Sequence, residues 1–294
     1  MTDIDEALDW RGNEVRCEAC VHRELLADGR CRLKHACLHD RYARRIDRFF
    51  DWNPGLANDY LAHPHFEVRA IAAKSADVFR LPRLLDDPDE TVRWNAVQRL
   101  PQIYLRRLSA DPHREVRIRV ASGLDDADLV PMMEDPDYYV RLIVARRIAP
   151  DMLPLMMRDP EVEVRRVVVG RIGADWLMPM AADIDAAVRL GAAQRLSPHQ
   201  LIWLQQDPDW RVRHEVASRI EIPLLAGMRD DPDPFVRDVA RRRLGAPQAG
   251  EAGRAASAPN GTAEAAHMPE ARMPCDSGLS RQAARDQGPV SGGR

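Results

Sequence analysis

Residues 87–110 read DPDETVRWNAVQRLPQIYLRRLSA, and this 24-residue unit decides the fold. It contains an Asp-Pro pair, then a Val-Arg pair, and finally two leucines three residues apart, Leu105 and Leu108. The Val-Arg pair occurs eight times, always 24 residues apart and without an insertion. The eight pairs begin at Val68, Val92, Val116, Val140, Val164, Val188, Val212 and Val236. A constant period of this kind predicts a solenoid, in which each repeat packs against its neighbours in a row.

The first half of each unit is expected to form an amphipathic α-helix. Asp is frequent at the N-cap of a helix and Pro at its first position, so a helix is predicted to begin at every Asp-Pro. Acidic residues that follow, such as Asp89 and Asp137, would interact favourably with the helix dipole. Counted from each valine, apolar residues recur at positions +4 and +8, which places them on one stripe of the helix.

The second half of each unit is expected to form a short 3₁₀-helix. Apolar residues occupy positions +13 and +16, and residues three apart align on a 3₁₀-helix. Only about eight residues separate the first helix from the next Asp-Pro, and they often include proline. The sequence therefore predicts an all-α solenoid of eight repeats, with alternating α- and 3₁₀-helices, over residues 59–245. HEAT and armadillo repeats are longer, at roughly 40 residues.

The repeat departs from its pattern in three places. The first repeat has His63-Pro64 and the sixth has Asp183-Ile184 in place of Asp-Pro. The third has Gly123 where six others carry arginine. An irregular first repeat is expected at a capped end. The eighth repeat ends without a second helix, and three polar residues are expected to cap that end: Arg241, Arg242 and Arg243.

The arginine that follows each valine is predicted to be structural. On a helical wheel its position borders the buried stripe rather than opposing it. A partly buried arginine needs several acceptors, and Asp-Pro recurs at the same interval. We therefore expect the stems to pack between repeats and the guanidinium groups to bind aspartates or carbonyls of adjacent turns. The alternative is a ladder that binds a ligand. The eight residues are Arg69, Arg93, Arg117, Arg141, Arg165, Arg189, Arg213 and Arg237.

A second feature precedes the repeats: four cysteines within 21 residues, at Cys17, Cys20, Cys31 and Cys37. The N-terminus shows no export signal, so the protein is expected to be cytoplasmic and these thiols reduced. Residues 1–58 are too few to hold a fold unaided, and a metal centre would supply stability. Zinc and an iron-sulfur cluster both accept four thiolates. Structural zinc sites favour two matched Cys-x2-Cys pairs, whereas one is present here. The spacing favours a cluster and leaves zinc, or no metal, open.

Other residues of this segment bear on the metal site. His22, His35 and His39 could replace a thiolate in a zinc site but are expected to form an exposed basic face. Nine Lys and Arg stand against five Asp and Glu from Arg16 to Arg48, and they either stabilise an anionic cluster or form a solvated surface. The fifth cysteine, Cys275, is predicted to bind nothing. Four aromatic residues are expected to pack this domain onto the first repeat: Trp10, Phe49, Phe50 and Trp52.

Composition limits the possible partners. The chain of 294 residues carries 43 Lys and Arg and 46 Asp and Glu, a net charge of −3, which gives no bulk attraction to nucleic acid or anionic membranes. No stretch approaches the roughly 20 apolar residues that a membrane span needs. Residues 246–294 are rich in Ala, Gly, Ser and Pro and are predicted to be a disordered tail.

The 24-residue unit with its three landmarks, preceded by four clustered cysteines, resembles the leucine-rich repeat variant family. The resemblance covers about residues 15–245. It implies a 4Fe-4S cluster in the N-terminal domain, residues 1–58, and a right-handed superhelix of alternating α- and 3₁₀-helices after it. It also implies that the cluster ligands are Cys17, Cys20, Cys31 and Cys37. It supplies no catalytic residues.

The leading hypothesis for function is a non-enzymatic scaffold that binds an unidentified protein on the solenoid surface, with a structural or redox-sensing cluster at one end. No Ser-His-Asp order, phosphate loop or His-Glu-x-x-His motif occurs, so we expect no catalytic residues. Nucleic-acid binding through the arginines is the alternative. It is less favoured because residues 59–245 hold 28 basic and 30 acidic residues. An enzyme that uses the cluster for electron transfer would need a substrate pocket.

Overall fold

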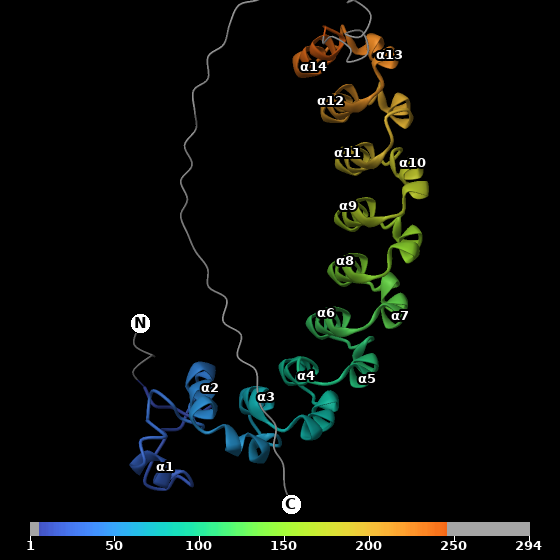
Figure 1. Cartoon of the computed structure of the whole chain (residues 1–294). Coiled ribbons are helices and arrows are strands. Elements are labelled where there is room, and N and C mark those ends of the chain that lie inside the picture. The colour runs from blue at the N-terminus through green and yellow to red at the C-terminus, as the bar shows by residue number, and fades with distance from the viewer. Residues whose placement is uncertain (1–5, 246–294) are drawn as a thin grey trace, which may run out of the picture. The chain divides into compact units, whose positions relative to one another are not determined.

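The computed structural model describes residues 6–245, which belong to one compact unit. The helices follow one another in chain order as a row (Figure 1). The tail predicted for residues 246–294, and Cys275 within it, lie outside the described residues. No helix within residues 6–245 is both long enough and apolar enough to cross a membrane.

The cysteine-rich part has few regular elements. It contains two helices, α1 (Arg23–Ala27) and α2 (Ala43–Trp52), and two isolated β-bridges, Leu8 with Glu14 and Arg32 with Ala36. The 3₁₀-helix η2 (Pro54–Tyr60) leads into the repeats and runs across the predicted domain boundary at residue 58. The predicted division at this point stays a prediction.

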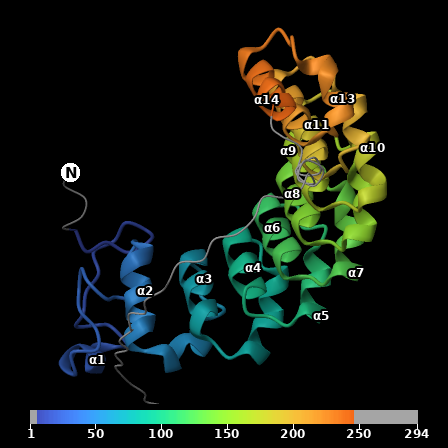
Figure 2. The same cartoon turned by 45° about the horizontal axis from the view of Figure 1, so that its top comes forward.

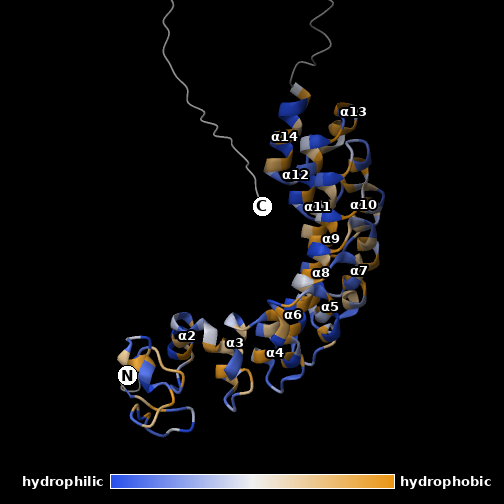
Figure 3. Ribbon diagram, turned by 60° about the horizontal axis from the view of Figure 1, so that its bottom comes forward, coloured by the Kyte–Doolittle hydropathy of each residue, from blue (hydrophilic) through white to orange (hydrophobic). Residues whose placement is uncertain are grey.

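Each repeat begins with a long helix, as the apolar stripe predicts, and Figure 2 shows these helices stacked side by side. Their bounds are α3 (Phe66–Ser75), α4 (Glu90–Val97), α6 (Arg114–Gly123), α8 (Tyr138–Arg147), α9 (Val162–Arg171), α11 (Ala186–Arg195), α12 (Trp210–Arg219) and α14 (Pro234–Gly245). Polar and apolar residues alternate around them (Figure 3), which is what amphipathic helices require.

The second halves contain the expected 3₁₀-helices, and four of the seven also include one turn of α-helix. These short segments lie on the opposite side of the row from the long helices (Figure 1). In chain order they are η3 (Val78–Asp86), α5 (Gln102–Leu105) with η4 (Arg106–Leu108), α7 (Asp126–Leu129) with η5 (Val130–Glu134), η6 (Pro150–Met156), η7 (Ala174–Trp176) with α10 (Leu177–Met180), η8 (Gln200–Leu204), and α13 (Ile222–Leu225) with η9 (Ala226–Met228).

The prediction that helices begin at Asp-Pro is wrong by two residues, since the N-cap of α4 is Asp89 rather than Asp87. Asp87 has extended backbone angles, φ −62° and ψ 137°, because a residue before proline is disfavoured in the helical region. Helix α4 begins at Glu90, and its N-cap is Asp89, whose carboxylate accepts the Thr91 N–H at 2.9 Å. Asp137 caps α8 in the same way. The residues assigned to the first turn are therefore the caps.

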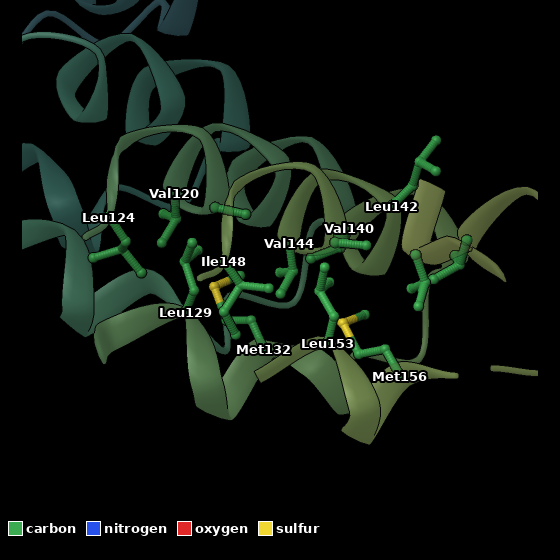
Figure 4. Packing of buried hydrophobic residues seen from close by; sticks show 14 of the residues in the cluster. Val120, Leu124, Leu129, Met132, Val140, Leu142, Val144, Ile148, Leu153 and Met156 are labelled. Atoms are coloured by element: carbon green, nitrogen blue, oxygen red, sulfur yellow. The ribbon is translucent and has the colours of Figure 1, made fainter. Parts of the chain in front are cut away.

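The core runs the length of the row between the long helices and the short segments. In Figure 4, Val140 and Val144 of α8 and Ile148 just after it point towards the short segments, where Leu153 and Met156 lie. All five side chains are almost fully buried. Burying a side chain of this kind contributes about 1.5–3 kcal/mol, so this repeated contact is the main source of stability.

Candidate functional site

The structure brings the four predicted ligands together. Cys17 and Cys20 lie in the loop before α1, where the Cys20 N–H donates to the Cys17 carbonyl at 3.2 Å. Cys31 and Cys37 lie on either side of the Arg32–Ala36 bridge and are buried. All four cysteines are free thiols. Two distant pairs in the sequence thus form one group.

Neighbouring thiols shift the pKa of Cys17, Cys31 and Cys37. Burial, and then the neighbouring Cys37 and Cys20, raise the pKa of Cys17. The Cys37 thiol donates a hydrogen bond to the Cys31 sulfur, which lowers the pKa of Cys31 and raises that of Cys37. Four thiolates so close to one another repel, and a bound cationic centre would remove that repulsion. The four thiols therefore lie close enough to one another to interact electrostatically.

The donor set fits a cluster. Within residues 6–245, no three His, Cys, Asp or Glu side chains are grouped closely enough to hold a single metal ion. Four thiolates are nevertheless the usual ligand set of a 4Fe-4S cluster. A 4Fe-4S cluster takes one thiolate on each of its irons, so its ligands are spread around a larger body. When bound, the cluster would connect four points of a domain that has little core of its own.

The expected exposed basic face of histidines is wrong. His22 and His39 are partly buried, and burial lowers the pKa of both. The His22 ring lies 5.3 Å from Phe49 and is hydrogen-bonded to the hydroxyl of Tyr60, while its backbone N–H donates to the Cys20 sulfur at 3.4 Å. His35 accepts Arg48 on its carbonyl at 3.0 Å. The burial of these histidines depends on the fold of a short, irregular domain. No periodic pattern in the sequence predicts it.

The basic segment contains both buried and exposed arginines. The charged residues named among the largest causes of the thiol pKa shifts are acidic: Glu18 raises the pKa of Cys17, and Asp40 raises that of Cys37. Arg45 is buried, not solvated, and its Nη1 donates to the carboxylate of Asp40 at 2.9 Å. Arg44 is exposed. The solvated-surface interpretation therefore applies to part of the segment, and the other part is structural.

Aromatic side chains join the cysteine-rich part to the first repeat. Phe49 and Phe50 are fully buried, and the Phe50 ring lies 5.9 Å from Tyr60. Trp10 stacks on His65, directly before α3, with ring centroids 5.3 Å apart. The prediction holds for these three residues and is wrong for Trp52, which contacts His35 within its own domain.

The eight arginines bind aspartates or carbonyls of this chain, as the structural prediction expects, and we call this series the arginine ladder. In Arg141, Nε and Nη2 donate to the two carboxylate oxygens of Asp159 at 2.7 and 3.0 Å, and Nη1 donates to the Asp135 carbonyl at 2.8 Å. The Asp159 carboxylate also accepts the Glu161 N–H at 2.8 Å. The same pairing, from one repeat to the next, is confirmed seven times: Arg69–Asp87, Arg93–Asp111, Arg117–Asp135, Arg141–Asp159, Arg165–Asp183, Arg189–Asp207 and Arg213–Asp231.

This pairing explains two departures from the repeat pattern. Asp183-Ile184 keeps the aspartate that Arg165 needs, and the Ile184 carbonyl accepts Arg189 at 3.0 Å as a proline carbonyl does elsewhere. His63 replaces aspartate in the first repeat, where no earlier repeat supplies an arginine. Its carbonyl still accepts Arg69 at 2.8 Å.

A second arginine ladder was given no role by the sequence argument. The arginine at +7 ends the long helix and donates to carbonyls at the end of the preceding one. Arg195, for example, donates to the carbonyls of Val169 and Ile172, each at 2.6 Å. The signal was available, since six repeats share this residue: Arg99, Arg147, Arg171, Arg195, Arg219 and Arg243. At Gly123 the ladder is interrupted, and the Leu105 side chain fills the space.

Two grooves open on the long helices. One, of about 440 Å³, lies between α2, α3 and α4 and is lined by residues that include Phe66, Lys74 and Trp94. The other, of about 410 Å³, lies between α11, α12 and α14 and includes Trp210 and Phe235. We call the surface that contains both grooves the long-helix face. Both grooves combine apolar and charged residues, as protein-binding surfaces do.

Comparisons with known proteins agree with the cluster domain and with the repeat fold. Residues 7–59 match the family model described as "LRV protein FeS4 cluster". The N-terminal part therefore carries a 4Fe-4S cluster domain, and zinc is set aside. A relative, the uncharacterized 27.7 kDa protein in the nifB 3′ region of Rhodobacter capsulatus, is 54% identical over 101 residues. These are 34% of this chain and 41% of that protein, so the chain spans about two fifths of that relative's length.

The chain matches a solved structure described as "A leucine-rich repeat variant with a novel repetitive protein structural motif". The two are 41% identical with a TM-score of 0.74, and the match covers 78% of this chain and 99% of that chain. With nearly the whole of that structure matched, and residues 7–59 matched by the cluster-domain model, the chain belongs to the leucine-rich repeat variant family.

Proposed function

We propose that Cys17, Cys20, Cys31 and Cys37 are the ligands of the 4Fe-4S cluster and that the cluster is structural. The support is their grouping as free thiols beside a core that includes Phe49 and Phe50, shared with the first repeat. Bound there, the cluster holds the end of the repeat row in place.

Metal analysis tests the ligand assignment. Anaerobically purified protein is expected to contain iron and acid-labile sulfide, and Cys37→Ser is expected to lose both. Cys275→Ser is the matched control and is expected to retain both. Stoichiometric zinc without sulfide, or an unchanged iron content in Cys37→Ser, would overturn the assignment.

We further propose that the protein is a non-enzymatic scaffold whose long-helix face binds another protein. The observation that carries this is a contrast between positions. The residues that recur in all or most repeats are internal, namely the valine, the two arginines and the aspartate. Position +2 lines both grooves and differs between repeats: Ala70, Trp94, Ile118, Leu142, Arg166, Leu190, His214 and Asp238. A surface that varies on a constant framework is suited to specific recognition.

The arginines of the ladders argue against nucleic-acid binding. Fourteen of the 28 basic residues in residues 59–245 belong to the two ladders, where they bind aspartates or carbonyls of this chain. The other fourteen share residues 59–245 with 30 acidic residues, which leaves no net positive charge to attract phosphates, the groups that dominate affinity for nucleic acids. Retention on DNA that falls steeply with salt would contradict the protein-binding proposal.

A pair of tryptophans provides the experiment. Trp210 is 43% exposed on the long-helix face, whereas Trp203 is 76% exposed on η8, on the other side of the row. Proteins cross-linked to the wild type in cells would be identified by mass spectrometry and compared between variants. A partner lost in Trp210→Ala and kept in Trp203→Ala is expected. The same partners in both variants would overturn the assignment of this face.

A further inference from the structure

The repeat row has an unmatched arginine at its C-terminal edge. In the ladder each arginine holds the aspartate 18 residues later, so Arg213 holds Asp231. The next pair would need a carboxylate at position 255, where the sequence has Ala255. Eight ladder arginines therefore face seven ladder aspartates.

Arg237 is nevertheless held like the other seven. Its Nη1 donates to the carbonyls of Asp231 and Pro232 at 2.6 and 2.8 Å, and these are the same two bonds that anchor each ladder arginine. Among residues 6–245 no carboxylate reaches its Nε or Nη2 atom. The Nε and Nη2 atoms, which bind an aspartate in the other seven arginines, therefore have no ladder aspartate within residues 6–245, although the side chain is held in the same way.

The other seven arginines show what this edge binds. In each, Nε lies 2.7–2.8 Å from one carboxylate oxygen and Nη2 lies 2.8–3.0 Å from the other. Six of the seven bound aspartates precede a proline, and Asp87, one of these six, has an extended backbone. A guanidinium fixed in this way selects planar anions that accept two hydrogen bonds, so carboxylates of acidic peptides are suited to it.

The surroundings at the edge also favour a protein segment. Leu244, near the end of α14, is only partly buried. Arg241 is occupied, since it donates to the Arg229 carbonyl and to Asp230. The opposite end of the row offers no matching group, because the first repeat has His63 in the aspartate position. Two copies joined end to end would bring no ladder carboxylate to Arg237.

We propose that the C-terminal edge of the row is a docking site for an acidic, extended segment of another protein, an aspartate before proline, whose carboxylate binds Arg237. Such a segment would supply what a ninth repeat supplies in the interior of the array. This site is separate from the grooves of the long-helix face, so each can be tested without the other.

The probe is a labelled peptide with the sequence of residues 197–209, acetylated and amidated at its ends, which presents Asp207 before Pro208. Its affinity for the full chain would be measured by fluorescence anisotropy. The peptide with Asp207→Asn is expected to bind at least about tenfold more weakly, since hydrogen bonds to a charged group are lost. Equal binding of the two peptides, or no binding by the full chain, would overturn the proposal.

Variants of the protein test whether Arg237 is the residue that binds the peptide. Arg237→Gln is expected to lose the preference for the aspartate peptide, and Arg237→Lys to lose most of it, because lysine keeps the charge but not the two-pronged geometry. The control is Arg242→Gln, an exposed neighbour that is expected to keep it. Far-ultraviolet circular dichroism checks folding, and Arg237→Lys serves if Arg237→Gln unfolds. An equal loss in Arg242→Gln would overturn the assignment.

One further variant distinguishes a partner from the chain's own tail. Residues 246–294 carry five acidic side chains, Glu251, Glu264, Glu270, Asp276 and Asp286. Replacing all five by their amides in the full chain is expected to leave the peptide affinity unchanged. If the peptide binds only to this variant, the tail occupies Arg237 and the proposal of a separate partner is wrong.

Discussion

Each ladder aspartate is bound from two sides. Asp159 accepts two hydrogen bonds from Arg141 of the preceding repeat and one from the backbone of its own repeat, so it fixes the distance between the two. Ion pairs of this kind add little net stability, because removing both charges from water is costly. Their effect is on specificity. A repeat that slipped by one residue would leave a buried arginine without its carboxylate.

Removing one member of a pair should therefore be costly. Arg141 and Asp159 are 11% and 4% exposed, and Arg141→Ala leaves the Asp159 carboxylate buried without its cation. We expect a loss of about 2–4 kcal/mol in the free energy of unfolding, measured by urea denaturation. Arg146→Ala is the control, since Arg146 is exposed on the same helix, and it should change stability by less than about 0.5 kcal/mol. Equal effects would show that the ladder is not structural.

A capping aspartate gives a pH dependence. The hydrogen bond from Arg211 lowers the pKa of Asp209 to about 2, from 3.8. A carboxylate with a lowered pKa stabilises the fold above its unfolded pKa and loses that contribution as the pH falls through the folded value. Wild type should be more stable than Arg211→Gln at neutral pH, and the difference should shrink between about pH 4 and pH 2. Urea midpoints measure it, and a constant difference would contradict the assignment.

At the scale of elements, the second ladder controls where long helices end. Arginines and the helix dipole interact favourably at a C-terminus, and the +7 arginine binds carbonyls that would otherwise lack partners. Helix α4 is the one long helix followed by a repeat without that arginine, because Gly123 takes its place. It spans eight residues, whereas α8 and α9 span ten.

Amide hydrogen exchange can test this difference without a mutation. Backbone amides near the end of α4, Gln98–Leu100, should exchange faster than those at the end of α9, which Arg195 holds. Arg195→Ala should raise exchange at the end of α9 towards that of α4 and leave α12 unchanged. Similar protection of the wild-type ends of α4 and α9 would show that the arginine has no role in ending the helix.

The elements also show what the sequence could and could not predict. The 24-residue period was enough to predict the repeats, the alternating helices and the structural role of the ladder arginines. Every repeat places the same residue types in the same surroundings. The helix starts were misplaced because the Asp87 carboxylate binds Arg69, 18 residues earlier, rather than capping its own helix. The histidines near the cysteines were misplaced because they lie in a domain without a period. Spacing alone could not choose between zinc and a cluster, since both accept four thiolates.

At the scale of the whole molecule, stability passes from neighbour to neighbour. Each repeat contacts the next, and the cysteine-rich part contacts the first through Phe50 and Tyr60. In such a row, a defect at one end weakens the adjacent repeats most and distant ones least. The cluster should therefore support the near end of the row rather than every repeat equally.

Loss of the cluster should produce a gradient. In Cys31→Ser, which removes one proposed ligand, hydrogen exchange should rise most in α2 and α3 and progressively less towards α12. The matched control is Cys275→Ser, which should exchange like wild type. Uniform loss of protection along all long helices would show instead that residues 6–245 unfold as one cooperative unit.

The direction of the ladder has a consequence for how such chains can change length. Every interior repeat offers an arginine at its trailing side and an aspartate at its leading side, so any interior repeat can follow any other. Duplicating or deleting one block of 24 residues, such as residues 141–164, leaves every other paired arginine with its aspartate 18 positions on. An insertion of another size would change either this spacing or the spacing of six residues between an aspartate carbonyl and the next arginine, as in Asp135 and Arg141. Whole repeats are thus the only units in which a family built this way gains or loses sequence at little energetic cost, and its members should differ in repeat number while keeping their repeat length.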